Sequence, residues 1–262
     1  MSYIIGFALA LLLFAVTYLG KHFTVSGAVV ASIIVALFSI FNLWSLLLLL
    51  LFTYIMLMVS DNVTAKRRKP IADSVLDKSG ARTAVQIFAN GFAPLLSTVI
   101  FVTTENRVFL IIFAVGVGVT FADSIASDIG IFSRKAPRDI CTWKQTAPGL
   151  SGGVSSLGVM LSIAASICFS IMAYVLMRLS LSEAMLIALF SFVGSILDSI
   201  LGSRLQVKYR CEICNFFTEK KRHCDVSTRQ VGGLRLIDNC TVNLISSLVT
   251  CSFSFLLLAI GG

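Results

Sequence analysis

Acidic residues stand at the edges of otherwise apolar segments in this chain of 262 residues. Asp123 and Asp128 end one long apolar run, and Asp198 interrupts another. Ionisable side chains in such places are costly and are usually functional. Oxygen ligands gathered in one place suit a hard cation, and Mg²⁺ is commonly held by one or two carboxylates together with substrate phosphates. We therefore expect Asp123, Asp128 and Asp198 to act as catalytic residues and to bind Mg²⁺.

Simpler alternatives exist for the acidic and amide residues of the C-terminal part. Asp198 could be a buried carboxylate paired with Arg204, and Asp238 and Asn239 could cap a helix. Asn243 lies one helical turn beyond Asn239, a spacing that capping alone does not explain. We predict that Asp238, Asn239 and Asn243 contact the substrate or a nucleotide.

A glycine-rich stretch at 148–158 leads directly into an apolar run. Glycines let backbone N–H groups approach an anion closely, and the start of the following helix adds its positive dipole end. The stretch is not a Walker loop, because no Gly-Lys-Ser/Thr follows, and small residues also permit close helix packing in membranes. The residues predicted to bind phosphate are Gly149, Ser151, Gly152, Gly153 and Ser155.

Basic residues could neutralise the charge of a transferred phosphate. We expect Arg82 and Arg138 to have this catalytic role and Lys66 to contact the substrate, although the basic run at 66–69 could simply anchor the chain near anionic lipid. The chain contains only two histidines, and no Ser–His–Asp arrangement can be assembled from them. Phosphoryl or nucleotidyl transfer needs little more than positioning and charge neutralisation, which carboxylates, a metal ion and basic residues provide.

Three cysteines and a histidine cluster in one polar segment, as Cys211-x-x-Cys214 followed by His223-Cys224. The spacing predicts a tetrahedral zinc site that pins the loop at 204–239. With four protein ligands the ion would have no open position and would be structural. A redox role and the absence of any special role are the alternatives, while a cytosolic location would disfavour a disulfide.

The composition places this chemistry in a membrane. Hydrophobic residues make up 57% of the chain and charged residues 13%, where a soluble domain carries roughly 25% charged residues. The apolar residues form runs near the ~20 residues that span a bilayer. We predict an all-α, polytopic helical bundle that forms one integral membrane domain over residues 1–262. Its transmembrane helices, about eight in number, are predicted at Tyr3–Leu19, Val25–Phe41, Leu43–Ser60, Val85–Thr104, Val108–Ile125, Val154–Met177, Ala184–Leu201 and Thr241–Ile260.

Long polar loops follow the third, fifth and seventh predicted helices, at 61–84, 128–153 and 202–239. With eight spans these loops share one side of the membrane. That side carries nineteen of the 21 Lys and Arg residues, and the other side carries only Arg107 and Arg178. Because cytoplasmic loops are enriched in Lys and Arg, we expect the polar loops to face the cytoplasm and both termini to face away from it. A long or re-entrant element around Asn42 is the alternative topology.

An ordered series of short motifs runs from about Gly80 to the C-terminus. The motifs are Gly80-Ala81-Arg82 with Gln86, Ala89-Asn90-Gly91, Ala122-Asp123-Ser124 through Ser127-Asp128-Ile129-Gly130, Ala136-Pro137-Arg138, Gly149 through Ser155, Leu197-Asp198-Ser199-Ile200-Leu201-Gly202 with Leu205-Gln206, and Asp238-Asn239 with Val242-Asn243. The series resembles a family that comprises transmembrane protein 19 of animals, the plant phytyl-phosphate kinase and many prokaryotic proteins, the domain-of-unknown-function 92 membrane proteins. The Cys/His loop is similar to the one in transmembrane protein 19.

The resemblance implies an activity, which is phosphorylation of a prenyl monophosphate to a diphosphate. The family is similar to the CTP-using dolichol and phytol kinases, so the donor would be CTP or a similar nucleoside triphosphate. The resemblance also implies a substrate or nucleotide role for Asn90. Asp128 stands where the family motif usually has Glu, which conserves the charge and shortens the side chain.

We therefore expect a magnesium-dependent prenyl-phosphate kinase with a structural zinc site. A cytidylyltransferase that makes a CDP-lipid is the alternative enzyme, and a transporter of ions or phosphorylated lipids is the alternative outside catalysis. Transport is disfavoured because the functional-looking residues crowd one face. The expected partners are membrane lipid, a prenyl phosphate and a nucleoside triphosphate, with no nucleic acid. A homodimer is an open alternative for the assembly.

Overall fold

The computed structural model describes residues 2–76 and 80–261 of the chain. Within these residues it contains eight α-helices: α1 (Ser2–Leu19), α2 (Val25–Ile40), α3 (Trp44–Val75), α4 (Ala84–Thr104), α5 (Val108–Gly130), α6 (Ser156–Met177), α7 (Leu181–Arg204) and α8 (Asn239–Gly261). Short strands occupy the connections: β1 (Arg138–Asp139), β2 (Gly153–Val154), β3 (Lys208–Arg210), β4 (Phe217–Thr218), β5 (Arg222–His223), β6 (Val226–Ser227) and β7 (Arg229–Gly232).

The helices match the predicted apolar segments in order and position. Among the described residues, six helices, α3 to α8, are long and apolar enough to cross a membrane, while α1 and α2 contain shorter apolar stretches. The apolar runs form helices because a bilayer offers no water to satisfy backbone polar groups, so each segment must satisfy them internally. Capping residues define several helix starts, such as Thr83 for α4 and Ser180 for α7, each within a capping box.

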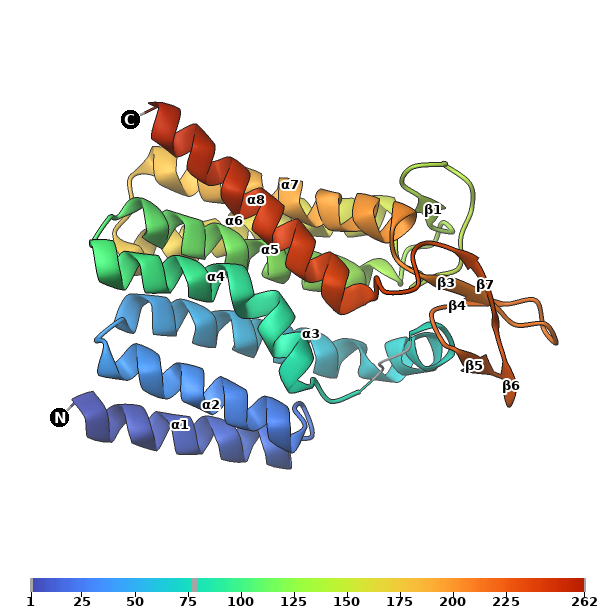
Figure 1. The fold of residues 1–262 in the computed structure, drawn as a ribbon, viewed down its shortest axis with the longest axis horizontal. Coiled ribbons are helices and arrows are strands. Elements are labelled where there is room, and N and C mark those ends of the chain that lie inside the picture. Colours follow the sequence, from blue (N-terminus) through green and yellow to red (C-terminus); the bar gives the residue numbers. More distant parts are fainter. Residues whose placement is uncertain (1, 77–79, 262) are drawn as a thin grey trace.

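Helix α5 is the centre of the bundle. It packs against α3, α4, α6, α7 and α8, whereas α1 packs mainly on α2 at the edge (Figure 1). Its buried side chains include Phe113 and Phe121, and the Phe121 ring lies 5.8 Å from that of Phe169 in α6. An apolar core of this kind fixes the positions of any polar group that the central helix carries.

The helices alternate in direction, so the long connections gather at one end of the bundle (Figure 1). We call this end the loop face, and it carries the described residues of the connections at 20–24, 80–83, 131–155 and 205–238. There the backbone N–H of Arg82 donates to His22 O at 2.8 Å. At the opposite end Arg107 donates to the Arg178 carbonyl at 2.9 Å. Lys78, one of the basic residues expected in these loops, lies outside the described residues.

Two of the predicted loops are partly helical, which corrects the boundaries derived from hydropathy. Helix α3 continues through the basic run to Val75, and Pro70 lies inside it. The carbonyls of Ser74 and Val75 accept hydrogen bonds from Thr218 at 3.0 and 2.9 Å, so a distant loop satisfies the helix end. Helix α5 continues from Ile125 to Gly130 and therefore contains Asp128.

The third polar loop folds into a small β structure that we call the Cys/His ribbon, residues 207–232. Its strands form a three-stranded antiparallel sheet in the order β4-β3-β7 and a two-stranded hairpin of β5 and β6. The second loop carries the antiparallel pair β1–β2, in which Arg138 lies opposite Val154. The bundle is thus helical as predicted, with short strands confined to the loop face.

Candidate active site

Close packing of α5 and α7 brings two of the predicted carboxylates together. A Cβ on Gly118 of α5 would lie 2.0 Å from Ser191 Oγ of α7, and a Cβ on Gly194 of α7 would meet Val119 at 2.3 Å. Small residues allow such an approach of helix backbones in membranes. Asp123 and Asp198 follow these contacts by about one turn, so the helix pair holds them side by side.

A cavity of about 260 Å³ opens at the loop face, between the ends of α3, α4, α5, α6, α7 and α8. It contains most of the residues that the sequence predicted for the site. Those that line it are Arg82, Asn90, Asp123, Asp128, Gly149, Ser151, Gly152, Gly153, Ser155, Asp198, Asn239 and Asn243. The structure therefore brings together side chains that lie more than 150 residues apart along the chain, as the ordered motifs suggested.

Asp198 is held by residues of the last helix. Its Oδ2 accepts a hydrogen bond from Ser246 at 2.8 Å. The Asn243 side chain lies between Asn90, 2.8 Å away, and the Asp198 carboxylate; with its nitrogen turned toward Asp198 it donates to Oδ2 at 3.0 Å. Asn243, predicted to contact substrate, thus orients Asp198, and Asn90, predicted to do the same, contacts Asn243. The alternative partner of Asp198, Arg204, is an exposed residue at the end of α7.

Asp123 and Asp128 belong to α5, and both line the same cavity. Asp128 is 2% exposed, and its Oδ2 accepts a long hydrogen bond of 3.5 Å from Ser60 of α3. Asp123 is near enough to Asp198 and Asp128 for their charges to repel. A smaller cavity of about 10 Å³ lies beside Asp123 and Asp198. Three carboxylates this close together favour the binding of a counter-cation.

The donor set fits magnesium through one or two of these carboxylates at a time. Among the described residues, the Asp side chains do not form a compact group of converging ligand atoms of the kind that the Cys/His cluster forms. Magnesium does not require such a group, because substrate phosphates and water usually complete its octahedral shell. The three aspartates around an open cavity are therefore compatible with Mg²⁺ that arrives with a nucleotide.

The glycine-rich loop forms one wall of the cavity. Gly152 has φ of +82°, and a Cβ there would lie 2.4 Å from Ser203 Cα of α7, so only glycine fits. Ser155 is the N-cap of α6: its hydroxyl accepts from Gly158 N and donates to Gly130 O, both at 3.1 Å. Gly152 and Ser155 thus support the close-packing interpretation and also line the cavity, whereas phosphate binding by this stretch stays a prediction.

The predicted basic residues separate into two groups. Arg82 lines the cavity and forms an ion pair of 3.7 Å with Asp61. Lys66 is an exposed residue of α3 that does not line the cavity. Arg138 is exposed as well; it donates to the Trp143 carbonyl at 3.0 Å and does not line the cavity. The structure thus brings Arg82 alone of these three to the carboxylates.

Asp238 occupies the helix-cap position that was the simpler alternative for it. Its Oδ1 accepts from the backbone N–H and the hydroxyl of Thr241, both at 3.0 Å, at the start of α8. Asp238 does not line the cavity, whereas Asn239 and Asn243 do. The contact predicted between Asp238 and the substrate therefore has no support in the geometry.

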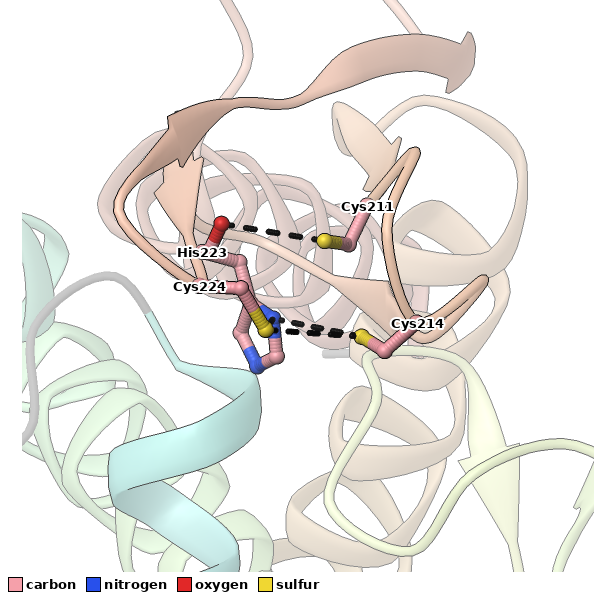
Figure 2. A group of neighbouring side chains, drawn as sticks. All are labelled: Cys211, Cys214, His223 and Cys224. Atoms are coloured by element: carbon pink, nitrogen blue, oxygen red, sulfur yellow. Dashed lines mark hydrogen bonds between the residues drawn. The ribbon is translucent and has the colours of Figure 1, made fainter.

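The Cys/His cluster lies in the ribbon, outside the cavity. Figure 2 shows Cys214, His223 and Cys224 turned toward one another from two neighbouring turns. The ligand atoms of Cys211, Cys214, His223 and Cys224 all lie within 4.8 Å of one another. Sγ of Cys214 is 3.8 Å from Sγ of Cys224 and 3.5 Å from Nδ1 of His223. Zinc–ligand lengths imply edges of about 3.8 Å between two sulfurs and roughly 3.6 Å between sulfur and nitrogen in a tetrahedral site.

The thiols of this cluster differ in acidity. The backbone N–H of Cys214, together with the contact of Cys211 with His223, lowers the pKa of the Cys211 thiol to about 6. The contact of Cys224 with Cys214 raises the pKa of the Cys224 thiol to about 11. Metal binding requires deprotonated thiols, so of these two thiols Cys211 would be the more readily available to a metal ion at neutral pH.

Sequence reasoning missed a set of polar contacts at the loop face. Buried Glu219 of the ribbon accepts from the backbone N–H and the hydroxyl of Ser151 in the glycine-rich loop. Asp139 accepts from Ser203 at 2.8 Å and lies 3.7 Å from Lys208. Burial would raise the pKa of Asp139, but the Ser203 and Thr142 hydrogen bonds hold it below its ordinary value. The sequence signal that could have identified Glu219 and Asp139 was the presence of acidic residues within loops that are otherwise basic.

Two serines inside the bundle were also missed. The Ser162 and Ser195 hydroxyls, on α6 and α7, lie 2.5 Å apart and line the cavity wall. Their sequence context is apolar, and serine is common in membrane helices as a packing residue. No spacing rule could have distinguished them from the other serines of these helices.

A helical bundle of this length and hydropathy, with a polar cavity at one end, defines a multi-pass integral membrane protein. A family model described as integral membrane protein DUF92 matches residues 8–251, and the chain belongs to this family. Over 139 residues it is 30% identical to protein PGR of Arabidopsis thaliana. The aligned region covers 49% of this chain and 47% of that protein, so it spans about half of each. No solved structure matches the chain.

Proposed function

We propose that this protein transfers the terminal phosphoryl group of a nucleoside triphosphate, CTP or similar, to an isoprenyl monophosphate. The observation that supports the proposal most strongly is the cavity at the loop face, where Asp123, Asp128 and Asp198 meet Arg82 at the end of an apolar bundle. Residues from each of the ordered motifs that resemble those of the plant phytyl-phosphate kinase line this same cavity. Site and family resemblance therefore point to one chemistry.

The reaction needs positioning and charge neutralisation more than covalent help. A phosphate oxygen of the lipid attacks the γ-phosphorus, the bond to the β-phosphate oxygen breaks, and the nucleoside diphosphate leaves. Asp123 and Asp198 would hold Mg²⁺, with Asp128 beside them. The ion would offset the repulsion between the two phosphates and align the reacting oxygens. Asn243 and Ser246 keep the Asp198 carboxylate oriented.

The membrane location suits an acceptor with an apolar tail. The isoprenoid chain would lie in the bilayer between helices, and its phosphate would reach the loop face. Arg82, at the rim of the cavity, would contact a phosphate in place of Asp61. In this arrangement the loop face would be cytoplasmic, where nucleoside triphosphates are available; its excess of Lys and Arg supports this orientation.

We also propose that the Cys/His cluster binds one structural zinc ion. The four ligand atoms and their spacings, given above, support this assignment, and four protein ligands leave no position for catalysis. Purified protein should contain about one zinc per chain, and the double change Cys211→Ser with Cys214→Ser should lose it. Cys168→Ser, an exposed thiol of α6, should retain the metal. Clean wild-type protein without zinc would reject the assignment.

Product mass tests the proposed reaction. Purified protein is incubated with Mg²⁺, CTP or ATP, and a panel of prenyl monophosphates, and the lipid products are analysed by mass spectrometry. The proposal expects a lipid that has gained one phosphoryl group, together with a nucleoside diphosphate. A lipid that has gained a nucleotide, with release of pyrophosphate, would instead identify a cytidylyltransferase. No covalent product with any donor would favour a transporter.

A further inference from the structure

One short segment of the Cys/His ribbon contacts two walls of the cavity. Residues 218–220 lie between the two turns of the ribbon that carry the cluster: Cys211 and Cys214 precede the segment, and His223 and Cys224 follow it. A cross-link between the two turns would therefore fix both ends of the segment. None of the proposed catalytic residues belongs to it.

The segment first contacts the end of α3. Thr218 donates its hydroxyl to Ser74 O and Val75 O at 3.0 and 2.9 Å, and the Glu219 backbone N–H donates to Val75 O at 2.8 Å. The Lys220 ammonium group adds a hydrogen bond to Asp73 O. These donors satisfy carbonyls that the helix end would otherwise leave without partners, so the segment caps α3.

The same segment also contacts the glycine-rich loop. The Glu219 side chain is buried, and its Oε1 accepts from Ser151 N at 3.0 Å and from Ser151 Oγ at 2.5 Å. Hydrogen bonds to a buried carboxylate are among the stronger ones in proteins. Lys208 of β3, which carries the opposite charge, is also close enough to Glu219 for their charges to attract.

Both of the contacted elements line the cavity. Ile71 of α3 and Leu76, which follows α3, lie on one wall, and Gly149 to Gly153 lie on another. The two walls also touch directly, since a Cβ on Gly149 would lie 3.2 Å from Ile71. Residues 218–220 thus hold the walls in a fixed relative position from outside the cavity.

We propose that Glu219 is a positioning residue, which fixes the glycine-rich loop against α3 for binding of the donor phosphates, and that the Cys/His cluster holds Glu219 in place. The phosphate part rests on the proposed function, whereas the coupling between ribbon and loop does not. Glu219 acts through Ser151 and not by contact with the substrate, because its carboxylate is turned to the loop backbone. The cluster would then affect nucleotide binding without a catalytic metal.

Amide hydrogen exchange tests the coupling without reference to activity. Peptides that cover 149–155 are followed in detergent-solubilised wild type, Glu219→Ala and Glu219→Gln, with Glu212→Ala as the matched control on an exposed glutamate of the same ribbon. Glu219→Ala should speed exchange in this loop about tenfold, and Glu219→Gln should do so less, because its amide oxygen still accepts from Ser151. The Cys211→Ser, Cys214→Ser double variant should reproduce the Ala result.

Unchanged exchange in a folded Glu219→Ala protein would overturn the coupling, as would an equal effect of Glu212→Ala. A response to Glu219→Ala but not to loss of the cluster cysteines would overturn the role of the cluster. Should Glu219→Ala fail to fold, Glu219→Gln and Ser151→Ala, which removes only the hydroxyl donor, give the same comparison.

Steady-state kinetics then test the positioning role. Glu219→Ala should raise KM for the nucleotide about tenfold and change kcat less than threefold, and Glu219→Gln should restore most of the affinity. A faster-exchanging loop with unchanged KM would refute the assignment to donor binding. Wild-type protein that turns over no prenyl phosphate would refute the proposed function and leave the exchange result as it stands.

Discussion

At the scale of single residues, Arg82 is the basic side chain that the structure brings to the carboxylates. It is partly exposed and pairs with Asp61 at 3.7 Å, so a phosphate can compete for it. We expect Arg82→Ala to raise KM for the phosphorylated substrate about tenfold, equivalent to about 1.4 kcal/mol, with a smaller effect on kcat. Steady-state kinetics provide the measurement.

Arg204→Ala is the matched control, because Arg204 is exposed at the loop face and does not line the cavity. Equal effects of the two changes would show that general surface charge, and not a contact in the cavity, attracts the substrate.

Residue types and spacing predicted the acidic centre of the site but not every partner. Asp123, Asp128 and Asp198 were recognisable because carboxylates are rare at the edges of apolar helices. Arg138 was expected among the catalytic residues, but it is exposed and does not line the cavity, so its role stays a prediction. Glu219 was overlooked because it lies 68 residues from Ser151, its main partner. A contact of that range leaves no local pattern in the sequence.

At the scale of elements, the glycine-rich loop depends on a glycine at position 152. A side chain there would need φ of +82° and would collide with the Ser203 backbone of α7. We expect Gly152→Ala to displace the loop, to destabilise the protein by about 2 kcal/mol or more, and to weaken nucleotide binding. Thermal unfolding and KM report the two effects.

Gly232→Ala in β7 is the matched control, because a Cβ at that position would meet nothing within 4 Å and φ there is not in the positive range. It should leave both the unfolding temperature and KM unchanged. A Gly152→Ala protein with wild-type stability and KM would show that the loop can move away from α7 without consequence.

Element boundaries were less predictable than element identity. Hydropathy placed the helices correctly, but it ended α3 and α5 where polar residues begin. Helix α3 continues because Thr218 and Glu219 satisfy its last carbonyls, and α5 continues because Asp128 is buried against α3. Both extensions depend on tertiary contacts, which a hydropathy window does not contain.

At the scale of the whole molecule, the charge distribution predicts the orientation in the membrane. The loop face carries the Lys- and Arg-rich connections, and the opposite end carries Arg107 and Arg178. By the positive-inside rule, reporters inserted after Lys144 or Arg222 should both be cytoplasmic, and one after Asn106 should lie on the other side. Reporters after Lys144 and Arg222 that lie on opposite sides of the membrane would contradict this arrangement of the helices, because the two positions share the loop face.

The bundle itself was predictable in class, because a bilayer restricts apolar segments to helices. For the cavity, the sequence predicted which residues belong together but not how they are arranged around it. Which residues share its walls follows from packing details such as Gly118 against Ser191, and single-sequence patterns do not specify them. The motifs indicated that the residues belong together, and the structure shows that they surround one space.

The central claim is that the aspartates of this cavity carry out phosphoryl transfer, and the rate of γ-phosphoryl transfer to prenyl monophosphate tests it most directly. Asp123→Asn and Asp198→Asn keep the size of the side chain and remove its charge. Each should lower the rate about a hundredfold or more, which corresponds to roughly 2.7 kcal/mol, while the proteins still fold and insert. Asp225 is an exposed residue outside the cavity, so the Asp225→Asn protein should transfer the γ-phosphoryl group at the wild-type rate. Well-folded Asp123→Asn and Asp198→Asn proteins that both transfer the γ-phosphoryl group at the wild-type rate would contradict the account.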